Sequence, residues 1–138
     1  MLPNPNFNKY SLVLITEEKN IIFTSKKTGL RPLFEVIKKY KGNITNCLLY
    51  DKIIGLAAAR LVSYSGFITS VYTPLCSKDA RDFLIANNIP IQSEKIVEKI
   101  LNKDKTQSCP MEEKARLVKD NEDFFNYLSL LFSSSPSI

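Results

Sequence analysis

Short apolar runs alternate with amphipathic stretches along most of this 138-residue chain. Runs of β-branched and other apolar residues that are bounded by polar turn residues predict strands. The predicted strands cover residues 11–16, 21–26, 46–50, 67–73 and 89–92. Only the polar turn EEKN separates the first two runs, so they predict an N-terminal β-hairpin.

Between and after these runs, apolar residues recur at the spacing of one helix face, which predicts helices. The predicted helices cover residues 30–40, 55–65, 77–88 and 94–103, and two more follow Cys109 and Asp120. Ser77, Ser93 and Asp120 are residue types that cap helix N-termini. Gly42 and Gly66 are expected to end the first two helices.

The predicted elements begin with two strands, continue with helices and strands in alternation, and end with consecutive helices. Strands that alternate with helices predict a three-layer α/β/α sandwich, with helices on both faces of a mixed sheet and the hairpin at its start. Crossovers of this length make successive strands parallel, with right-handed connections. We expect a flexible arm over residues 1–10, one α/β domain over 11–132 and a disordered tail over 133–138.

Composition is typical of a single soluble domain, with 44% hydrophobic and 24% charged residues. No apolar run approaches the roughly 20 residues that a membrane span needs. The first ten residues, MLPNPNFNKY, lack the basic and apolar segments of a signal peptide, so we expect a cytoplasmic protein. The three cysteines, Cys47, Cys76 and Cys109, are then expected to be reduced thiols.

Histidine is absent from the chain. Its absence removes the commonest metal ligand and the commonest general base, and it excludes Ser-His-Asp or Cys-His catalysis within this chain. A zinc site would need cysteines and carboxylates alone, and their spacing does not support one. We therefore expect neither a metal nor another cofactor.

The net charge of +5 is unevenly distributed along the chain. Residues 1–69 hold ten basic and four acidic side chains, whereas residues 70–138 hold nine and ten. The basic half could attract phosphates or nucleic acid, or it could be an ordinary solvated surface. Nucleic acid is the less favoured partner because no motif combines basic and aromatic residues. The sequence does not decide between a monomer and a homodimer.

Four short segments occur in a characteristic order: GLRPL, DKIIGLAAA, VY and SCPME. In their order and spacing they resemble a small microbial family, domain-of-unknown-function family 1893, over about residues 11–128. The resemblance implies a cytidine-deaminase-like fold. It implies no established activity.

Zinc deaminases with that fold carry a His or Cys and a Glu at one helix start, and Pro-Cys-x-x-Cys at the next. The matching segments here are GLAAA, around Gly55, and PLCSKD, around Ser77. Cys76 stands where one ligand would, but Asp79 replaces the second cysteine. Deamination by the zinc mechanism is therefore not expected.

Cys109 precedes Pro110 and would occupy the cap position of a helix. Glu112 would then be the third helical residue and could accept a hydrogen bond from the Cys109 backbone. Unpaired N–H groups and the positive end of the helix dipole favour a thiolate. The alternatives are a nucleophile activated by a carboxylate or lysine, a ligand contact, or a small apolar residue in a structural role.

Asp51 and Lys52 follow a predicted core strand, where ligands of open α/β sheets collect. Asp51 could cap the next helix or orient a ligand, Lys52 could meet a phosphate at that helix start, and Gly55 could admit a close backbone approach. Alternatively, all three could be structural. Arg31 could clamp an anion or brace a loop, and Tyr72 could line the same opening.

The leading functional hypothesis is binding of a small anionic or nucleotide-like ligand, with Asp51, Lys52, Gly55 and Glu112 around it, Arg31 and Tyr72 nearby, and Asp51 and Cys109 facing one cleft. The first alternative is a metal-free enzyme that uses Cys109 with Asp51 or Lys52. The second is a weak RNA-binding module.

Overall fold

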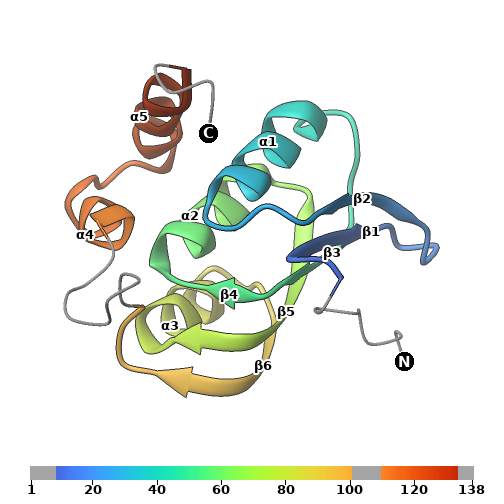
Figure 1. Cartoon of the computed structure of the whole chain (residues 1–138), viewed down its shortest axis with the longest axis horizontal. Coiled ribbons are helices and arrows are strands. Elements are labelled where there is room, and N and C mark those ends of the chain that lie inside the picture. Colours follow the sequence, from blue (N-terminus) through green and yellow to red (C-terminus); the bar gives the residue numbers. More distant parts are fainter. Residues whose placement is uncertain (1–8, 101–109, 134–138) are drawn as a thin grey trace.

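The computed structural model describes residues 9–100 and 110–133 (Figure 1). Its strands are β1 (Leu12–Ile15), β2 (Ile21–Ser25), β3 (Cys47–Asp51), β4 (Ile53–Ile54), β5 (Ile68–Ser77) and β6 (Ile91–Val97). Its helices are α1 (Arg31–Tyr40), α2 (Leu56–Ser65), α3 (Lys78–Ala86), α4 (Pro110–Leu117) and α5 (Asn121–Ser133). None of these helices is long and apolar enough to cross a membrane.

The strands form one mixed, open sheet in which β5 is the central long strand. The hairpin strands β1 and β2 pair antiparallel, and β1 also pairs antiparallel with β3. The strands β3, β4 and β6 all run parallel to β5. The strands β3 and β4 pair with the same edge of β5, and Lys52 interrupts the strand between them. This break between β3 and β4 opens one side of the candidate site.

The main core lies between the helices and one face of the sheet. Alternate residues of the strands, such as Leu12, Leu49 and Val71, join a cluster to which all five helices contribute. The helices α4 and α5 pack chiefly on α2 and α1. A smaller cluster around Val13, Ile15 and Tyr50 lies on the other face. The predicted class, an α/β fold on a mixed sheet with an N-terminal hairpin, is confirmed. Helices were expected on both faces of the sheet, but in the described residues all five helices contribute to the core on one face.

Most predicted helix ends are also confirmed. The Ser77 hydroxyl accepts a hydrogen bond from the Ala80 N–H at 3.2 Å and so caps α3. Gly66 ends α2 with a φ of 73°, a left-handed conformation that glycine adopts without a steric penalty. Asp120 accepts from the Asp123 N–H at 3.1 Å at the start of α5. The predicted arm and tail fall largely outside the described residues.

The helix predicted over residues 94–103 is wrong as far as the structure describes it. Strand β6 instead continues through Val97, and Ser93 lies inside it rather than at a helix start. Parallel pairing with β5, for example between Cys76 and Ile96, provides backbone hydrogen bonds that outweigh the helical spacing of the apolar residues. The two-residue strand β4 was not predicted, because so short a run carries no periodicity.

Candidate functional site

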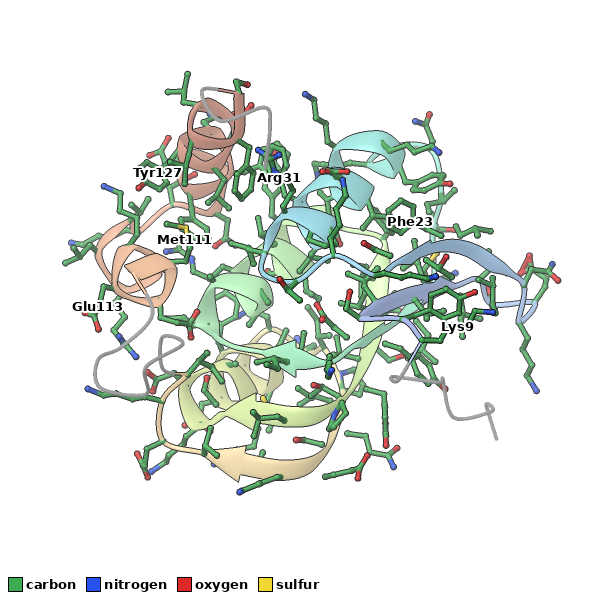
Figure 2. All side chains as sticks on the ribbon, viewed as in Figure 1. Lys9, Phe23, Arg31, Met111, Glu113 and Tyr127 are labelled. Carbon is green, nitrogen blue, oxygen red and sulfur yellow. The ribbon has the colours of Figure 1, made fainter. Side chains whose placement is uncertain are left out.

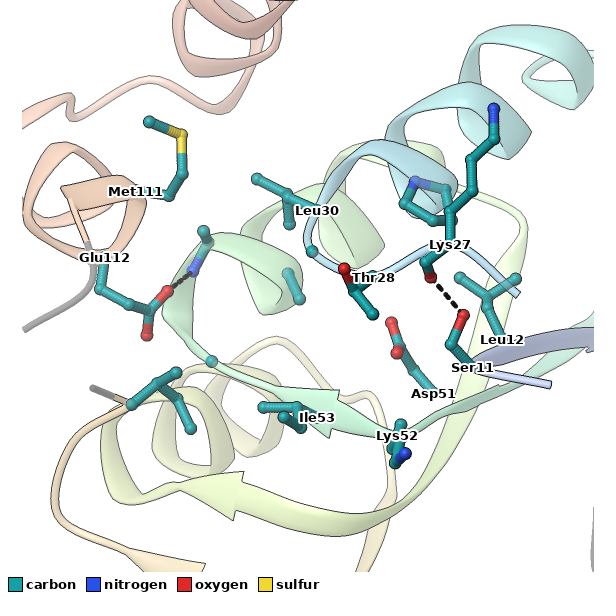
Figure 3. Close-up of a pocket in the computed structure, with 16 residues that line it drawn as sticks. Ser11, Leu12, Lys27, Thr28, Leu30, Asp51, Lys52, Ile53, Met111 and Glu112 are labelled. Atoms are coloured by element: carbon teal, nitrogen blue, oxygen red, sulfur yellow. Dashed lines mark hydrogen bonds between the residues drawn. The ribbon is translucent and has the colours of Figure 1, made fainter. Parts of the chain in front are cut away.

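A pocket of about 260 Å³ opens where the start of α1, the break between β3 and β4, and the starts of α2 and α4 meet (Figure 3). It brings together four residues that the sequence predicts for one site: Asp51, Lys52, Gly55 and Glu112. Most of the remaining wall is apolar, with Leu30, Ile53 and Met111 among the contributing side chains. A concave, largely apolar cavity with a few converging polar groups is typical of a small-molecule site.

The side chain of Asp51 points into this pocket, toward Thr28 (Figure 3). Asp51 is the last residue of β3 and stands opposite Leu12, a core residue. Removal of the carboxylate from water raises the pKa of Asp51 to about 8, although the backbone N–H groups of Ile53 and Lys52 oppose this shift. At neutral pH the Asp51 carboxyl is therefore largely protonated.

Asp51 does not cap α2, which was one of the two roles considered for it. The α2 N-cap is Gly55, which is extended and offers no side chain. The carboxylate of Glu112, from α4, takes the capping role: Oε1 accepts from the Leu56 N–H at 2.7 Å, and Oε2 accepts from the Ala57 N–H at 2.8 Å. The positive end of the α2 dipole thus already faces an anion.

The only hydrogen bond that the sequence suggests for Glu112 is one from the Cys109 backbone of its own helix, and its contact with α2 was not predicted. Its side chain is 4% exposed. Burial raises the pKa of Glu112, against the effect of the two backbone N–H groups and of Arg116. Gly55 makes the contact sterically possible, because a Cβ at position 55 would lie 2.3 Å from Glu112 Oε1.

The segment after β2 forms the opposite wall. Ser11 Oγ donates to the carbonyl oxygens of Ser25, at 3.1 Å, and of Lys27, which holds this segment against β1 (Figure 3). Sequence analysis missed Thr28 and Met111 as wall residues. A signal for Thr28 existed, because β2 and β3 flank β1 and end at the same edge of the sheet. Met111 lies beside Glu112, a predicted site residue, but the sequence does not show which side chains of that helix face the pocket.

Two predicted site residues lie elsewhere, which corrects the idea of one site for all of them. Arg31 Nη2 donates to the Phe132 carbonyl oxygen at 2.8 Å, and the guanidinium lies 4.9 Å from the Phe132 ring centroid, so Arg31 joins α1 to α5 (Figure 2). Tyr72 packs on Tyr50 on the other face of the sheet, with a ring-centroid distance of 5.3 Å, and its hydroxyl donates to Glu94.

The cysteines give no support to a metal centre. Cys76 is fully buried and Asp79 is paired with Arg116 at 3.4 Å. Within residues 9–100 and 110–133, no group of three or more histidine, cysteine or acidic residues could hold a metal ion. Cys109 and its predicted position opposite Asp51 lie outside the described residues.

The profile of the TM1506 family, a domain of unknown function (DUF1893), matches residues 6–131. The chain belongs to this family. The crystal structure of a DUF1893 family protein (TM1506) from Thermotoga maritima is similar to it, with a TM-score of 0.80 and 26% sequence identity, over 91% of this chain and 84% of that one. No curated protein matches the chain.

Proposed function

We propose that this DUF1893 domain binds a small nucleotide-like ligand in the pocket between α1, β3 and α2. The flat, mostly apolar body of the ligand would occupy the pocket, and any anionic group would lie at its mouth. The observation that carries this proposal is the side chain of Asp51. It occupies an apolar pocket, and no ion pair involves it within the described part of the chain.

The protonation state of Asp51 determines which ligand it suits. A neutral carboxyl presents an O–H donor beside a C=O acceptor. This pair complements a ligand edge that also has one donor beside one acceptor, as in a lactam or an amidine. Heterocyclic bases carry such edges, which is why a nucleotide-like ligand fits this site better than a simple apolar one.

The charge distribution favours one direction for an anionic ligand. Glu112 already occupies the N-terminus of α2, so a phosphate at that helix end would have to displace a buried carboxylate. Lys27 and Lys52 line the pocket and are exposed. A phosphate at the mouth could approach both ammonium groups, although Lys27 also lies 4.0 Å from Glu35. This placement differs from the phosphate position expected from the sequence alone.

Acid–base catalysis at the same pocket is the second candidate. A carboxyl whose pKa is about 8 exchanges its proton near neutral pH, as a general acid or base must. Turnover of a bound ligand would distinguish this candidate from simple binding. In that case Asp51 would transfer the proton, and Cys109 would be tested as the nucleophile.

Calorimetry and thermal shift against free bases, nucleosides and nucleotides test the proposal. A ligand at 100 times its Kd stabilises the fold by about 2.7 kcal/mol. We expect Asp51→Leu to abolish binding and Asp82→Asn, a change on the exposed face of α3, to leave it intact. Lys52→Gln should weaken only phosphorylated ligands, with Lys95→Gln as the matched control. The proposal fails if no compound binds, or if Asp51→Leu binds as tightly as the unmodified chain.

A further inference from the structure

The interface between α2 and α4 contains two buried charged side chains that do not pair with each other. Arg60 and Glu112 are 5% and 4% exposed, and they are the only buried charged residues within the described ranges. Each binds the backbone of the opposite helix. Glu112 of α4 accepts from N–H groups at the start of α2, and Arg60 of α2 donates to carbonyl oxygens at the end of α4.

Arg60 also connects α4 to α5. Its Nη1 donates to the carbonyl oxygens of Ala115, at 2.6 Å, and Val118, and its Nε donates to Asn121 Oδ1 at 2.9 Å. Its Nη2 is buried and has no hydrogen-bond partner. The guanidinium also lies 5.3 Å from the Phe124 ring centroid. One arginine of α2 therefore joins the end of α4 to the start of α5.

The helices α4 and α5 differ in how many apolar side chains they bury against the rest of the fold. On α5, Phe124 and Leu128 are fully buried, and Phe125 stacks on Phe34 and on Tyr64 with both ring-centroid distances at 4.7 Å. On α4, Ala115 is the buried apolar residue in the described part, whereas Leu117 is 76% exposed. Met111 and Val118 are only partly buried against the core, and Arg116 pairs with Asp79 of α3 at 3.4 Å near the surface. At the pocket end of α4, the buried hydrogen bonds to α2 within the described residues all come from the Glu112 carboxylate.

Burying unpaired charges weakens such an interface. Each charge loses its hydration on docking, and backbone hydrogen bonds return only part of that free energy. Burial raises the pKa of Glu112 and lowers the pKa of Arg60, so both side chains are less favourably charged here than in water. Opening would return both charges to solvent and offset the contacts that are lost. By contrast, α3 docks through apolar residues such as Ala80 and Leu84.

We propose that α4 and α5 form a releasable flap on the α1–α2 surface, with Glu112 as the contact that closes it over the pocket. Met111 and Glu112 form part of the pocket wall, so release of α4 removes that wall and uncovers Leu56 and Ala57. The inference that this opening admits or releases a ligand rests on the proposed function. The existence of the flap does not depend on that function, and its opening is measurable without any ligand.

Native-state hydrogen exchange of the full chain, followed by NMR, tests the flap. Subglobal openings expose contiguous segments below the free energy of global unfolding. We expect the amides of α4, α5, Leu56 and Ala57 to exchange through one shared opening, with protection factors at least about tenfold below those of β1 and β3. If these amides exchange only with the central strands, the flap does not exist.

A matched pair of variants assigns the closing contact. Glu112→Ala should lower protection of α4, Leu56 and Ala57 by about tenfold or more, because docking of α4 would then bury the Leu56 and Ala57 N–H groups without an acceptor, and should leave β1 and β3 unchanged. Glu113→Ala is the control, because Glu113 is the next residue on α4 and points away from α2 (Figure 2). Equal effects of the two variants would overturn the role of Glu112. If Glu112→Ala does not fold, the exchange pattern of the unmodified chain still decides whether the flap exists.

Discussion

Gly55 and Glu112, 57 positions apart in the sequence, form one contact in which the missing side chain of the first makes room for the carboxylate of the second. The contact joins two of the segments that carry the family resemblance, DKIIGLAAA and SCPME. It provides a physical reason for both. The glycine clears space at the start of α2, and the glutamate provides the cap that this helix start lacks.

Substitution of Gly55 by alanine should therefore destabilise the fold by about 2–4 kcal/mol, because the new Cβ displaces the Glu112 carboxylate from two buried N–H groups. The backbone of Gly55 has a φ of −102° and a ψ of −175°, which alanine also adopts, so the penalty is not conformational. Denaturant unfolding measures it.

The control is a double-mutant cycle. In a Glu112→Ala background there is no carboxylate to displace, so Gly55→Ala should then cost less than about 1 kcal/mol. If the cost is the same in both backgrounds, the steric argument is wrong.

Asp51→Asn should make the fold more stable at alkaline pH. The folded pKa of Asp51, about 8, lies above its ordinary value of 3.8, so the native state binds the extra proton between these values. The stabilisation that the Asp51 carboxyl gives the folded state is therefore complete below about pH 4, decreases as the pH rises, and is lost above about pH 8. An asparagine resembles the protonated carboxyl and does not titrate.

We expect Asp51→Asn to match the unmodified chain near pH 4–5 and to exceed its stability by about 1–3 kcal/mol at pH 8.5. This range is smaller than the free energy that corresponds to the whole pKa shift of Asp51, because Asp51 keeps partial contact with solvent through the pocket. Thermal unfolding across this pH range measures the difference. A gap that stays constant with pH would show that Asp51 titrates normally in the folded state.

Ser77 and Ser93 both have the sequence signature of a helix cap, but only Ser77 caps a helix. Ser77→Ala should cost about 1 kcal/mol, because it leaves the Ala80 N–H without its acceptor. Ser93→Ala, in the exposed edge strand β6, should cost less than about 0.5 kcal/mol. Comparable losses in urea unfolding would contradict the assignment of these two elements.

The contrast between these two serines shows what sequence patterns could predict. The hairpin, α1, α2, α3 and the fold class followed from local spacing and caps. Only the start of β6 did, because Ile96, Val97 and Ile100 fit one helix face equally well, and pairing with β5 decides between strand and helix there. In the same way, Asp51 was placed by the rule that ligands meet strand ends, whereas the capping of α2 by Glu112 is a contact between distant segments that no local pattern encodes.

The three thiols should react at different rates with an alkylating agent at neutral pH. Cys47 and Cys76 are 1% and 0% exposed. Burial, followed by Glu18, raises the pKa of Cys47, and burial raises the pKa of Cys76 to about 11. At pH 7 only about one Cys76 in ten thousand is then a thiolate, the form that reacts.

Cys109 lies outside the described residues, and the prediction for it still comes from the sequence. It follows the polar segment KDKTQS and directly precedes α4, whose first residue is Pro110. The Glu112 carboxylate, whose charge would oppose a thiolate at Cys109, accepts hydrogen bonds from the Leu56 and Ala57 N–H groups, and these offset part of that charge. We expect Cys109 to be modified at least about tenfold faster than the other two thiols. Peptide mapping after limited alkylation measures the ratio, and preferential modification of Cys47 or Cys76 would remove the main support for Cys109 as a nucleophile.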